Sequence, residues 1–337
     1  MKKLFTILAV AATLVSCAKE DVVREAAREA IGFDNAFVEN STRSVETPGY
    51  SSSNLFNDFA VYGFVEGAPL FNGTKVANTG INNTELKPEW KYAGTQYWIA
   101  CAKYNFYAVA PYTGDWAVKA DTTPASTGAV ITFTNENGTQ DLLYSGIVAQ
   151  EGKASGNAAV AFNFKHILSK VKFTFENNYN ASNASIRVKN INITNAYKNG
   201  EATLGVSAAT WTASDDVNIN FGDVALDNVD TTDEAYTFGT ARESYYERLL
   251  IPGNKPWKIT FSVDLLVSGK LIKTYSHTAT ATVNFEAGKS YDFKTSITAA
   301  NIDPNNEQEP IEFTATMTDW SNETSKVETT PANPGQN

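Results

Sequence analysis

Histidine and acidic side chains are the groups of this chain that could carry out acid–base catalysis. The 337-residue sequence contains only two histidines, His166 and His277. A hydrolytic triad would place one of them beside a nucleophile and an acid, but the sequence has no Gly-x-Ser-x-Gly turn. It also lacks a phosphate-binding loop, a His-Glu-x-x-His motif and an EF-hand loop. We therefore expect no catalytic residue and no cofactor.

Paired carboxylates could still hydrolyse a glycosidic bond, because that reaction needs only two acids about 5 to 9.5 Å apart in space. Asp215, Asp216 and Asp303 are available. Neighbouring acids in a loop are more often solvated surface, and we interpret these three as surface residues. Two cysteines and two histidines leave too few ligands for a His/Cys metal site, so we also expect no metal.

Cys17 is the residue with the clearest chemistry. It follows Lys2-Lys3 and the apolar run Leu4–Ala12, which is too short to span a bilayer and is typical of a secretory signal. Leu14-Val15-Ser16-Cys17 resembles the site at which bacterial lipoproteins are cut and acylated. Acyl chains on Cys17 would anchor the protein in the outer membrane of the cell, exposed at its surface.

The elements after the signal are predicted to be almost entirely strands. A single helix is expected over residues 20–30, which are rich in alanine and charged residues. Beyond it the hydrophobic period changes to two. Val171, Phe173 and Phe175, for example, share one face of a strand.

The strands predicted from this pattern are Ile31–Val38, Phe59–Val65, Tyr104–Ala110, Ala129–Thr134, Leu142–Ala149, Ala158–Phe164, Leu168–Glu176, Ile186–Thr194, Arg248–Ile251, Lys258–Val267, Lys270–His277, Thr278–Phe285, Tyr291–Thr298 and Ile311–Trp320. Strands with one apolar and one polar face are typical of antiparallel β-sandwiches. No strand–helix–strand rhythm occurs, so the expected class is all-β.

Composition indicates a globular chain that does not bind nucleic acid. Hydrophobic residues make up 42% of the sequence and charged residues 19%, which is enough apolar material for packed cores. The 37 acidic and 27 basic residues give a net charge of -10. Binding to phosphates relies on clustered cations, so we expect no nucleic-acid partner.

Several motifs, in their order along the chain, resemble the fimbrillin family of type V pilus subunits. They are Cys17, the first strand Ile31-Gly32-Phe33, the basic site Thr42-Arg43-Ser44, Tyr97-Trp98, Phe106–Pro111, Phe164–Val171 and the terminal Asp319-Trp320. Each motif is short, and the resemblance depends on their order over nearly the whole chain.

The resemblance implies two transthyretin-like antiparallel β-sandwich domains in tandem. The expected division is a lipoprotein signal peptide (1–16), a short helical, lipidated propeptide with the first strand (17–43), an N-terminal sandwich (44–165), a C-terminal sandwich (166–320) and a polar tail (321–337). The boundary near residue 165 follows a polar, glycine-containing stretch.

The resemblance also implies an assembly mechanism with two partners, a trypsin-like Arg-specific protease and other pilus subunits. The protease would cut after Arg43 and leave Ser44 as the new N terminus. Ile31, Phe33 and Phe37 share one face of the first strand, so its loss would open a groove for a strand of another subunit. Arg24 and Arg28 compete as cleavage sites, but cutting there would leave the first strand attached.

A candidate donor strand begins at residue 311 and repeats the Ile-x-Phe start. Ile311, Phe313, Ala315 and Met317 lie on one of its faces. The alternative is that Ile311–Trp320 only completes the second sandwich of its own subunit.

The leading prediction is therefore a structural or adhesive subunit of a cell-surface pilus, exported as a lipoprotein and polymerised by strand exchange. Two alternatives stay open. One is a pilus anchor subunit that remains acylated and uncut, and the other is a surface lipoprotein that binds glycans and never polymerises.

Overall fold

The computed structural model describes residues 29–38, 57–80, 89–224, 235–302 and 309–320. The predicted signal peptide and polar tail lie outside these ranges, and so do Cys17, Arg43 and Ser44. Most of the helix predicted over 20–30 lies outside them too. Its last two residues, Glu29 and Ala30, are extended: Ala30 forms a bridge with Tyr97.

The described residues form strands and one short helix, which confirms the all-β class. In chain order the elements are β1 (Phe33–Val38), β2 (Asp58–Val65), β3 (Ala68–Asn78), β4 (Trp90–Tyr92), β5 (Lys103–Ala110), β6 (Trp116–Val118), β7 (Ala129–Thr134), β8 (Leu143–Tyr144), β9 (Val148–Glu151), β10 (Val160–His166), β11 (Ser169–Asn178), β12 (Ala184–Leu204), β13 (Ala209–Asn220), β14 (Ala241–Glu243), β15 (Arg248–Leu250), β16 (Gly253–Val267), β17 (Lys270–Phe285), β18 (Lys289–Thr298), α1 (Ala299–Ile302) and β19 (Thr314–Asp319).

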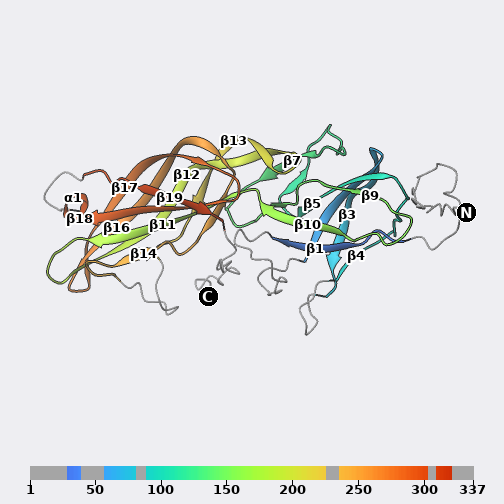
Figure 1. Ribbon diagram of the computed structural model, residues 1–337. Helices are drawn as coiled ribbons and strands as arrows, with labels where there is room; N and C mark the ends of the chain where they lie inside the picture. Colours follow the sequence, from blue (N-terminus) through green and yellow to red (C-terminus); the bar gives the residue numbers. More distant parts are fainter. Residues whose placement is uncertain (1–28, 39–56, 81–88, 225–234, 303–308, 321–337) are drawn as a thin grey trace, which may run out of the picture.

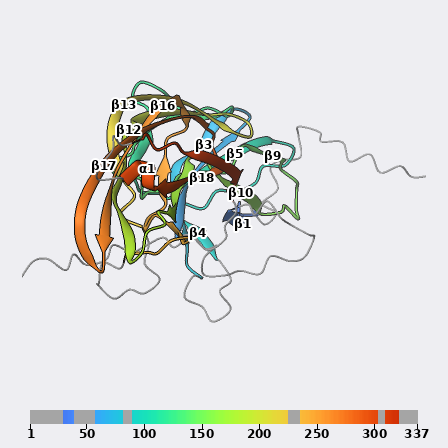
Figure 2. The same ribbon diagram turned by 90° about the vertical axis from the view of Figure 1, so that its left-hand side faces the viewer.

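An eight-stranded sheet occupies one end of the elongated molecule (Figure 1). Its order is β1-β10-β8-β5-β2-β3-β4, and β9 pairs with β5. The outer strands β1 and β4 contact each other and lie side by side in both views (Figures 1 and 2). The sheet therefore curls around a single apolar interior that β1 helps to close.

A five-stranded sheet and a six-stranded sheet form the other end. The five-stranded sheet has the order β14-β11-β18-β19, with β15 also on β11. The six-stranded sheet has the order β17-β16-β12-β7-β6, with β13 also on β12. Facing residues of these two sheets form the largest apolar core, which includes Phe173, Phe261 and Phe293.

Strand β12 links the two ends of the molecule. Its first part pairs with β16, and residues 199–204 pair with β7. Strands β6 and β7 fall within the range 44–165 assigned to the N-terminal sandwich, yet they belong to the same sheet as β16 and β17. A third apolar cluster, between the ends of the molecule, includes Tyr107, Leu204 and Trp320.

The structure differs from the predicted strands in several places. The two strands predicted over 270–285 form the single strand β17, and the strand predicted over 142–149 is divided between β8 and β9. Strands β3, β4, β6, β13 and β14 were not predicted. Two pairings are parallel, β1 with β10 and β11 with β18, in sheets that are otherwise antiparallel.

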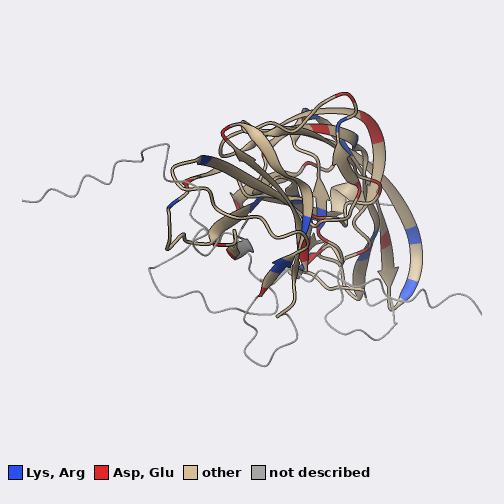
Figure 3. Cartoon of the chain, turned by 90° about the vertical axis from the view of Figure 1, so that its right-hand side faces the viewer, with Lys and Arg blue, Asp and Glu red and all other residues tan. Residues whose placement is uncertain are grey.

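Charged residues of both signs are interspersed along the strands (Figure 3). Several form ion pairs between neighbouring strands, such as Lys189 with Asp264 at 2.7 Å. Burial opposes ionisation of Asp264, but its hydrogen bonds to Lys189 and Thr274 outweigh this and lower the pKa of the carboxyl.

Candidate functional site

The predicted site residues that the structure describes lie in two segments, residues 29–38 near the N terminus and residues 309–320 near the C terminus. Residues 29–38 lie in the eight-stranded sheet, and residues 309–320 run along the five-stranded sheet. The backbone of Phe37 belongs to β1, but its side chain lies outside the described part of the chain.

Backbone hydrogen bonds hold the N-terminal segment on two sides. On one side, the Ile31 amide donates to the Gln96 carbonyl at 2.8 Å, and the Trp98 amide donates to the Glu29 carbonyl at 3.0 Å. On the other side, the Val160 amide donates to the carbonyl of Gly32 at 2.8 Å, which begins the parallel pairing of β1 with β10. The segment is therefore an integral part of the sheet.

Ile31 and Phe33 carry the apolar contacts of this segment. Their exposed fractions are 1% and 6%, so both side chains are buried. An aromatic cage surrounds the ring of Phe33, with centroid distances of 5.4 to 6.4 Å; its members are Phe59, Phe71, Tyr92, Phe106 and Phe162. Most of these contacts are edge-to-face, a favoured geometry for aromatic pairs.

Polar side chains fix the start of the segment. The Glu29 carboxylate accepts hydrogen bonds from the backbone amide of Asn157 at 2.9 Å and from its side-chain amide at 2.6 Å. These two bonds favour the charged form and lower the pKa of Glu29. The hydroxyl of Tyr92 donates to the Ile31 carbonyl at 2.7 Å.

No sequence pattern pointed to a role for Glu29, Tyr92 or Asn157. Asn157 is 128 residues from Glu29, and Tyr92 is 61 residues from Ile31. Each lies in a loop or short strand without a recognisable motif, and only the fold brings them together.

The candidate donor strand lies within its own subunit. Ile311 is buried, and a second aromatic cage around Phe313 consists of Phe173, Phe175, Phe261 and Phe293, with centroid distances of 5.5 to 6.3 Å. Strand β19 pairs with β18 and is an outer strand of the five-stranded sheet. Met317 lies opposite the buried Tyr291 but is 53% exposed, because the edge of the sheet leaves it uncovered.

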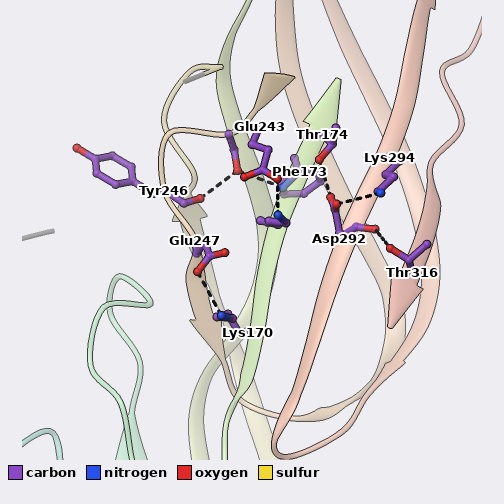
Figure 4. A network of polar contacts seen from close by, with 11 residues as sticks. Lys170, Phe173, Thr174, Glu243, Tyr246, Glu247, Asp292, Lys294 and Thr316 are labelled. Carbon is purple, nitrogen blue, oxygen red and sulfur yellow. Dashed lines mark hydrogen bonds and ion pairs between the residues drawn. The ribbon is translucent and has the colours of Figure 1, made fainter. Parts of the chain in front are cut away.

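Polar contacts on the other face of the sheet connect β19 with its neighbours (Figure 4). Asp292 on β18 lies at the centre: its carboxylate accepts from the hydroxyl of Thr174 at 2.8 Å and faces Lys294 at 3.5 Å. Its backbone carbonyl accepts a long hydrogen bond from Thr316 on β19, at 3.4 Å. β19 contributes the Thr316 hydroxyl to this network, and its Asp319 forms a separate ion pair with Lys289 on β18.

Both histidines pack against aromatic rings. The Nδ1 atom of His166 lies 2.7 Å from the carboxylate of Asp141, and the imidazole ring stacks on Trp320. His277 is buried and stacks on Phe261, and burial lowers the pKa of its imidazole.

Of the three acids that could serve in glycosidase chemistry, the structure describes Asp215 and Asp216. Asp215 and Asp216 are exposed on β13, where they bind the side chains of Asn199 and Lys255. Asp303 lies outside the described residues.

Two features are absent from the described residues. No three His, Cys, Asp or Glu side chains there lie close enough together to hold a metal ion. No helix among them is long and apolar enough to cross a bilayer.

Comparisons with known proteins give both a family and a fold. A family model described as fimbrillin-like matches residues 42–320. A fimbrial protein from Bacteroides vulgatus is 16% identical, with a TM-score of 0.61, and the match covers 87% of this chain and 99% of that one. A putative cell adhesion protein from Bacteroides uniformis is 18% identical, with a TM-score of 0.51 and coverages of 88% and 98%.

The search of curated proteins found no match. At identities this low, the two solved structures show a shared fold and nothing more. The family model, by contrast, spans most of the sequence. The chain therefore belongs to the fimbrillin-like family.

Proposed function

We propose that this protein is a structural or adhesive subunit of a cell-surface pilus. It is exported as a lipoprotein acylated on Cys17, cut after Arg43 by a trypsin-like protease, and polymerised when a strand of another subunit replaces residues 29–38. Membership of the fimbrillin-like family supports a surface subunit of the pilus or adhesion type. The family match begins at Thr42, next to the proposed cleavage site.

The observation that carries the proposal is the burial of Ile31 and Phe33 in a segment that precedes Arg43. Cleavage after Arg43 would cut the polypeptide between this segment and the described residues from 57 onward. The segment would then be held by its hydrogen bonds to Gln96, Trp98 and Val160 and by its pairing with β10. The side-chain bonds of Tyr92 to Ile31 and of Glu29 to Asn157 would also have to break.

Losing the segment would lower the folding stability of the domain. Burying Ile31 and Phe33 contributes about 1.5 to 3 kcal/mol each, or roughly 3 to 6 kcal/mol together. Whole domains are stable by only about 5 to 15 kcal/mol. An extended strand from another subunit could restore both the apolar contacts and the backbone pairing, as in other cases of β-strand addition.

The test is controlled cleavage of the folded chain. A Cys17→Ser variant without the signal peptide is purified, cut after Arg43, checked for Ser44 at the new N terminus by mass spectrometry and sized by light scattering. We expect oligomers after cleavage and monomers before it. An Arg43→Ala variant given the same protease should stay monomeric. Cleaved protein that remains monomeric at high concentration would refute polymerisation.

Mass spectrometry of the native surface form separates the alternatives. An N terminus at Ser44 means a shaft or tip subunit, and an acylated Cys17 means an anchor subunit. If the surface form is acylated and monomeric, affinity electrophoresis against polysaccharides tests for a glycan-binding lipoprotein.

A further inference from the structure

Strand β17 forms an edge of the six-stranded sheet, and its outer side is unpaired among the described residues. It pairs with β16 on one side only. In Figure 2 it lies at the outer margin of the molecule, with no other strand beyond it. In an antiparallel edge strand, alternate residues direct their N–H and C=O groups away from the neighbouring strand. β17 therefore offers a row of backbone donors and acceptors to a further strand.

The middle of β17 lacks the features that protect other edges of the described sheets. Residues 274–282 contain no Asp, Glu, Lys, Arg, Pro or Gly, and their pairing with β16 has no register shift. By contrast, the edge strands β4, β6 and β14 have only three residues each. β13 carries Asp215 and Asp216, and its pairing with β12 contains a register shift. Since proteins protect long edges with charges, proline, bulges or short strands, the middle of β17 is suited to pairing.

The exposed face of this stretch carries only hydroxyl side chains. They belong to Thr274, Ser276, Thr278, Thr280 and Thr282. The Thr274 hydroxyl donates to Asp264 on β16 at 2.7 Å, and the other four form no hydrogen bond with a described residue. Threonine favours strands, and threonine and serine hydroxyls can bond each other across neighbouring strands. The exposed face is therefore compatible with a second strand of the same sequence.

The exposed face of β17 is complementary to itself in one antiparallel register. When Thr278 of one copy lies opposite Thr278 of another, residues equally far from 278 in the two directions face each other. Ser276 then faces Thr280, and Thr274 faces Thr282. Two-fold symmetry repeats each of these contacts, because every residue that contacts a partner is contacted by it in turn. Each exposed position thus meets a hydroxyl of the other copy.

The buried face is complementary in size in the same register. Tyr275 and His277 are large and lie in the first half of the stretch, whereas Ala279 and Ala281 are small and lie in the second half. The register places Tyr275 opposite Ala281, and His277 opposite Ala279. Each large side chain therefore meets a small one, which suits the close packing of protein interiors.

Charges at the ends of β17 are complementary as well. Lys270 and Glu286 are equally far from Thr278 in sequence, so the lysine of one copy and the glutamate of the other come to the same end of the paired stretch. Both side chains are exposed, and neither forms a hydrogen bond or an ion pair with a described residue. Opposite charges on facing strands stabilise pairing, and symmetry forms this contact twice.

We propose that β17 pairs with β17 of a second copy of this chain, in the antiparallel register centred on Thr278. The pairing uses no residue of the segments 29–38 and 309–320 and needs no cleavage, so it does not depend on the proposed function. Edge pairing buries a narrow strip, and we therefore expect chains that are monomeric at about 10 µM to form dimers near about 1 mM. Polymers of the kind proposed above would present many such edges, and repeated pairing would hold two of them side by side.

Other registers lose one or more of these matches. Sliding one strand by one residue would place residues of the exposed face opposite residues of the buried face. Sliding it by two residues would centre the contact on His277 or on Ala279. Two imidazole rings would then crowd each other, or two alanines would leave a gap. Lys270 would also move away from Glu286.

Single-cysteine cross-linking reads the register. The background is an uncut chain without the signal peptide that carries Cys17→Ser, Cys101→Ser and Arg43→Ala, so that strand exchange after cleavage cannot contribute. One cysteine is introduced at residue 276, 278 or 280, three exposed positions on the same face. Each protein is concentrated to about 1 mM and oxidised.

Only residue 278 lies opposite itself in the proposed register. We expect Thr278→Cys to form disulfide-linked dimers about tenfold faster, or more, than Ser276→Cys or Thr280→Cys alone, since a disulfide needs closely spaced Cβ atoms. A mixture of Ser276→Cys and Thr280→Cys should cross-link as fast as Thr278→Cys. Faster self-cross-linking at 276 or 280, or equal rates at all three positions, would overturn the register.

Charge exchange at the centre of the contact tests the pairing without a covalent bond. Thr278→Lys or Thr278→Asp alone places like charges opposite each other, and we expect the dissociation constant measured by sedimentation equilibrium to rise about tenfold or more. A mixture of the two variants should dimerise again, because each lysine then faces an aspartate. Thr212→Lys, at an exposed position of β13, is the matched control and should change little.

Circular dichroism and thermal melting should show that both Thr278 variants fold, since the side chain they replace is exposed. Dimers that are unaffected by Thr278→Lys, or that the mixture of the two variants does not restore, would overturn the proposal. An unsubstituted edge that leaves the chain monomeric at about 1 mM would overturn it as well. None of these results bears on assembly after cleavage, so the proposed function is tested separately.

Discussion

The indole of Trp320 stacks on the imidazole of His166, with ring centroids 3.6 Å apart and planes within 9° of parallel. His166 is the last residue of β10, the strand on which β1 lies, and Trp320 directly follows β19, the candidate donor. An aromatic contact within one subunit thus connects the end of the candidate donor strand with the strand on which the first segment lies. The Trp320 amide also donates to the Gly288 carbonyl at 3.0 Å.

Replacing Trp320 with alanine should loosen the candidate donor strand. The side chain is 8% exposed, and we expect the unfolding free energy of the full chain to fall by about 3 to 5 kcal/mol. Assembly after cleavage should start sooner, because β19 leaves its own sheet more easily. Urea denaturation and light scattering measure the two effects. Met317→Ala, at a position 53% exposed, is the control and should change stability little.

Removing the ring of Phe33 should affect the uncut protein alone. Phe33→Ala empties the aromatic cage, and we expect a loss of about 3 to 5 kcal/mol in the unfolding free energy of the full chain. The polymer formed after cleavage should be unchanged, because residue 33 has been removed. Phe59→Ala, which alters the cage itself, should weaken both forms. A polymer weakened by Phe33→Ala would show that the segment is retained.

The attachment of residues 29–33 to the sheet should weaken at acidic pH, because the Glu29 carboxylate becomes protonated. The hydrogen bonds from Asn157 lower the pKa of Glu29 in the folded chain, so they stabilise the attached segment at pH values above the unfolded pKa of about 4.3. This contribution is lost as the pH falls through the folded pKa. Hydrogen-exchange protection of the Ile31 amide should therefore decrease below pH 4.

Glu29→Gln supplies the control for this pH dependence. Its protection at Ile31 should be lower at neutral pH and nearly independent of pH below 5. The amide of Ser244, which donates to the distant Phe173 carbonyl, should keep its protection in both proteins. Equal pH profiles for the two proteins at Ile31 would show that Glu29 does not hold the segment.

Gly63 should not accept a larger residue, because two rings of the Phe33 cage touch it. A Cβ atom at this position would lie 2.6 Å from Phe71 and 2.9 Å from Phe106. We expect Gly63→Ala to lower the unfolding free energy by about 1 to 3 kcal/mol, since the rings must move. Thermal melting of the full chain measures the loss. The control is Ala68→Gly, on the exposed start of β3, which should lower the unfolding free energy by less than about 1 kcal/mol. Gly156→Ala is not a suitable control, because the positive φ of Gly156 would add backbone strain.

Hydrophobic alternation located the central strands well, because their faces differ in burial. β5, β7, β11 and β18 lie within one or two residues of their predicted ranges. β3 was missed because Pro69, Asn72 and Gly73 interrupt its pattern, and its pairing with β2 contains two register shifts. β13 was missed because most of its residues are exposed, so no apolar face marks it.

The sequence by itself determined the all-β class, the family, and the apolar character of Ile31, Phe33, Ile311 and Phe313, since alternation along a strand reports burial locally. Only the tertiary structure decided which strands are parallel and which polar residues meet the first segment. Glu29 and Asn157 are far apart in sequence, and a contact between them depends on how the sheet curls. The backbone hydrogen bonds of Gln96, Trp98 and Val160 to the first segment depend on the same curling, so the sequence does not reveal them.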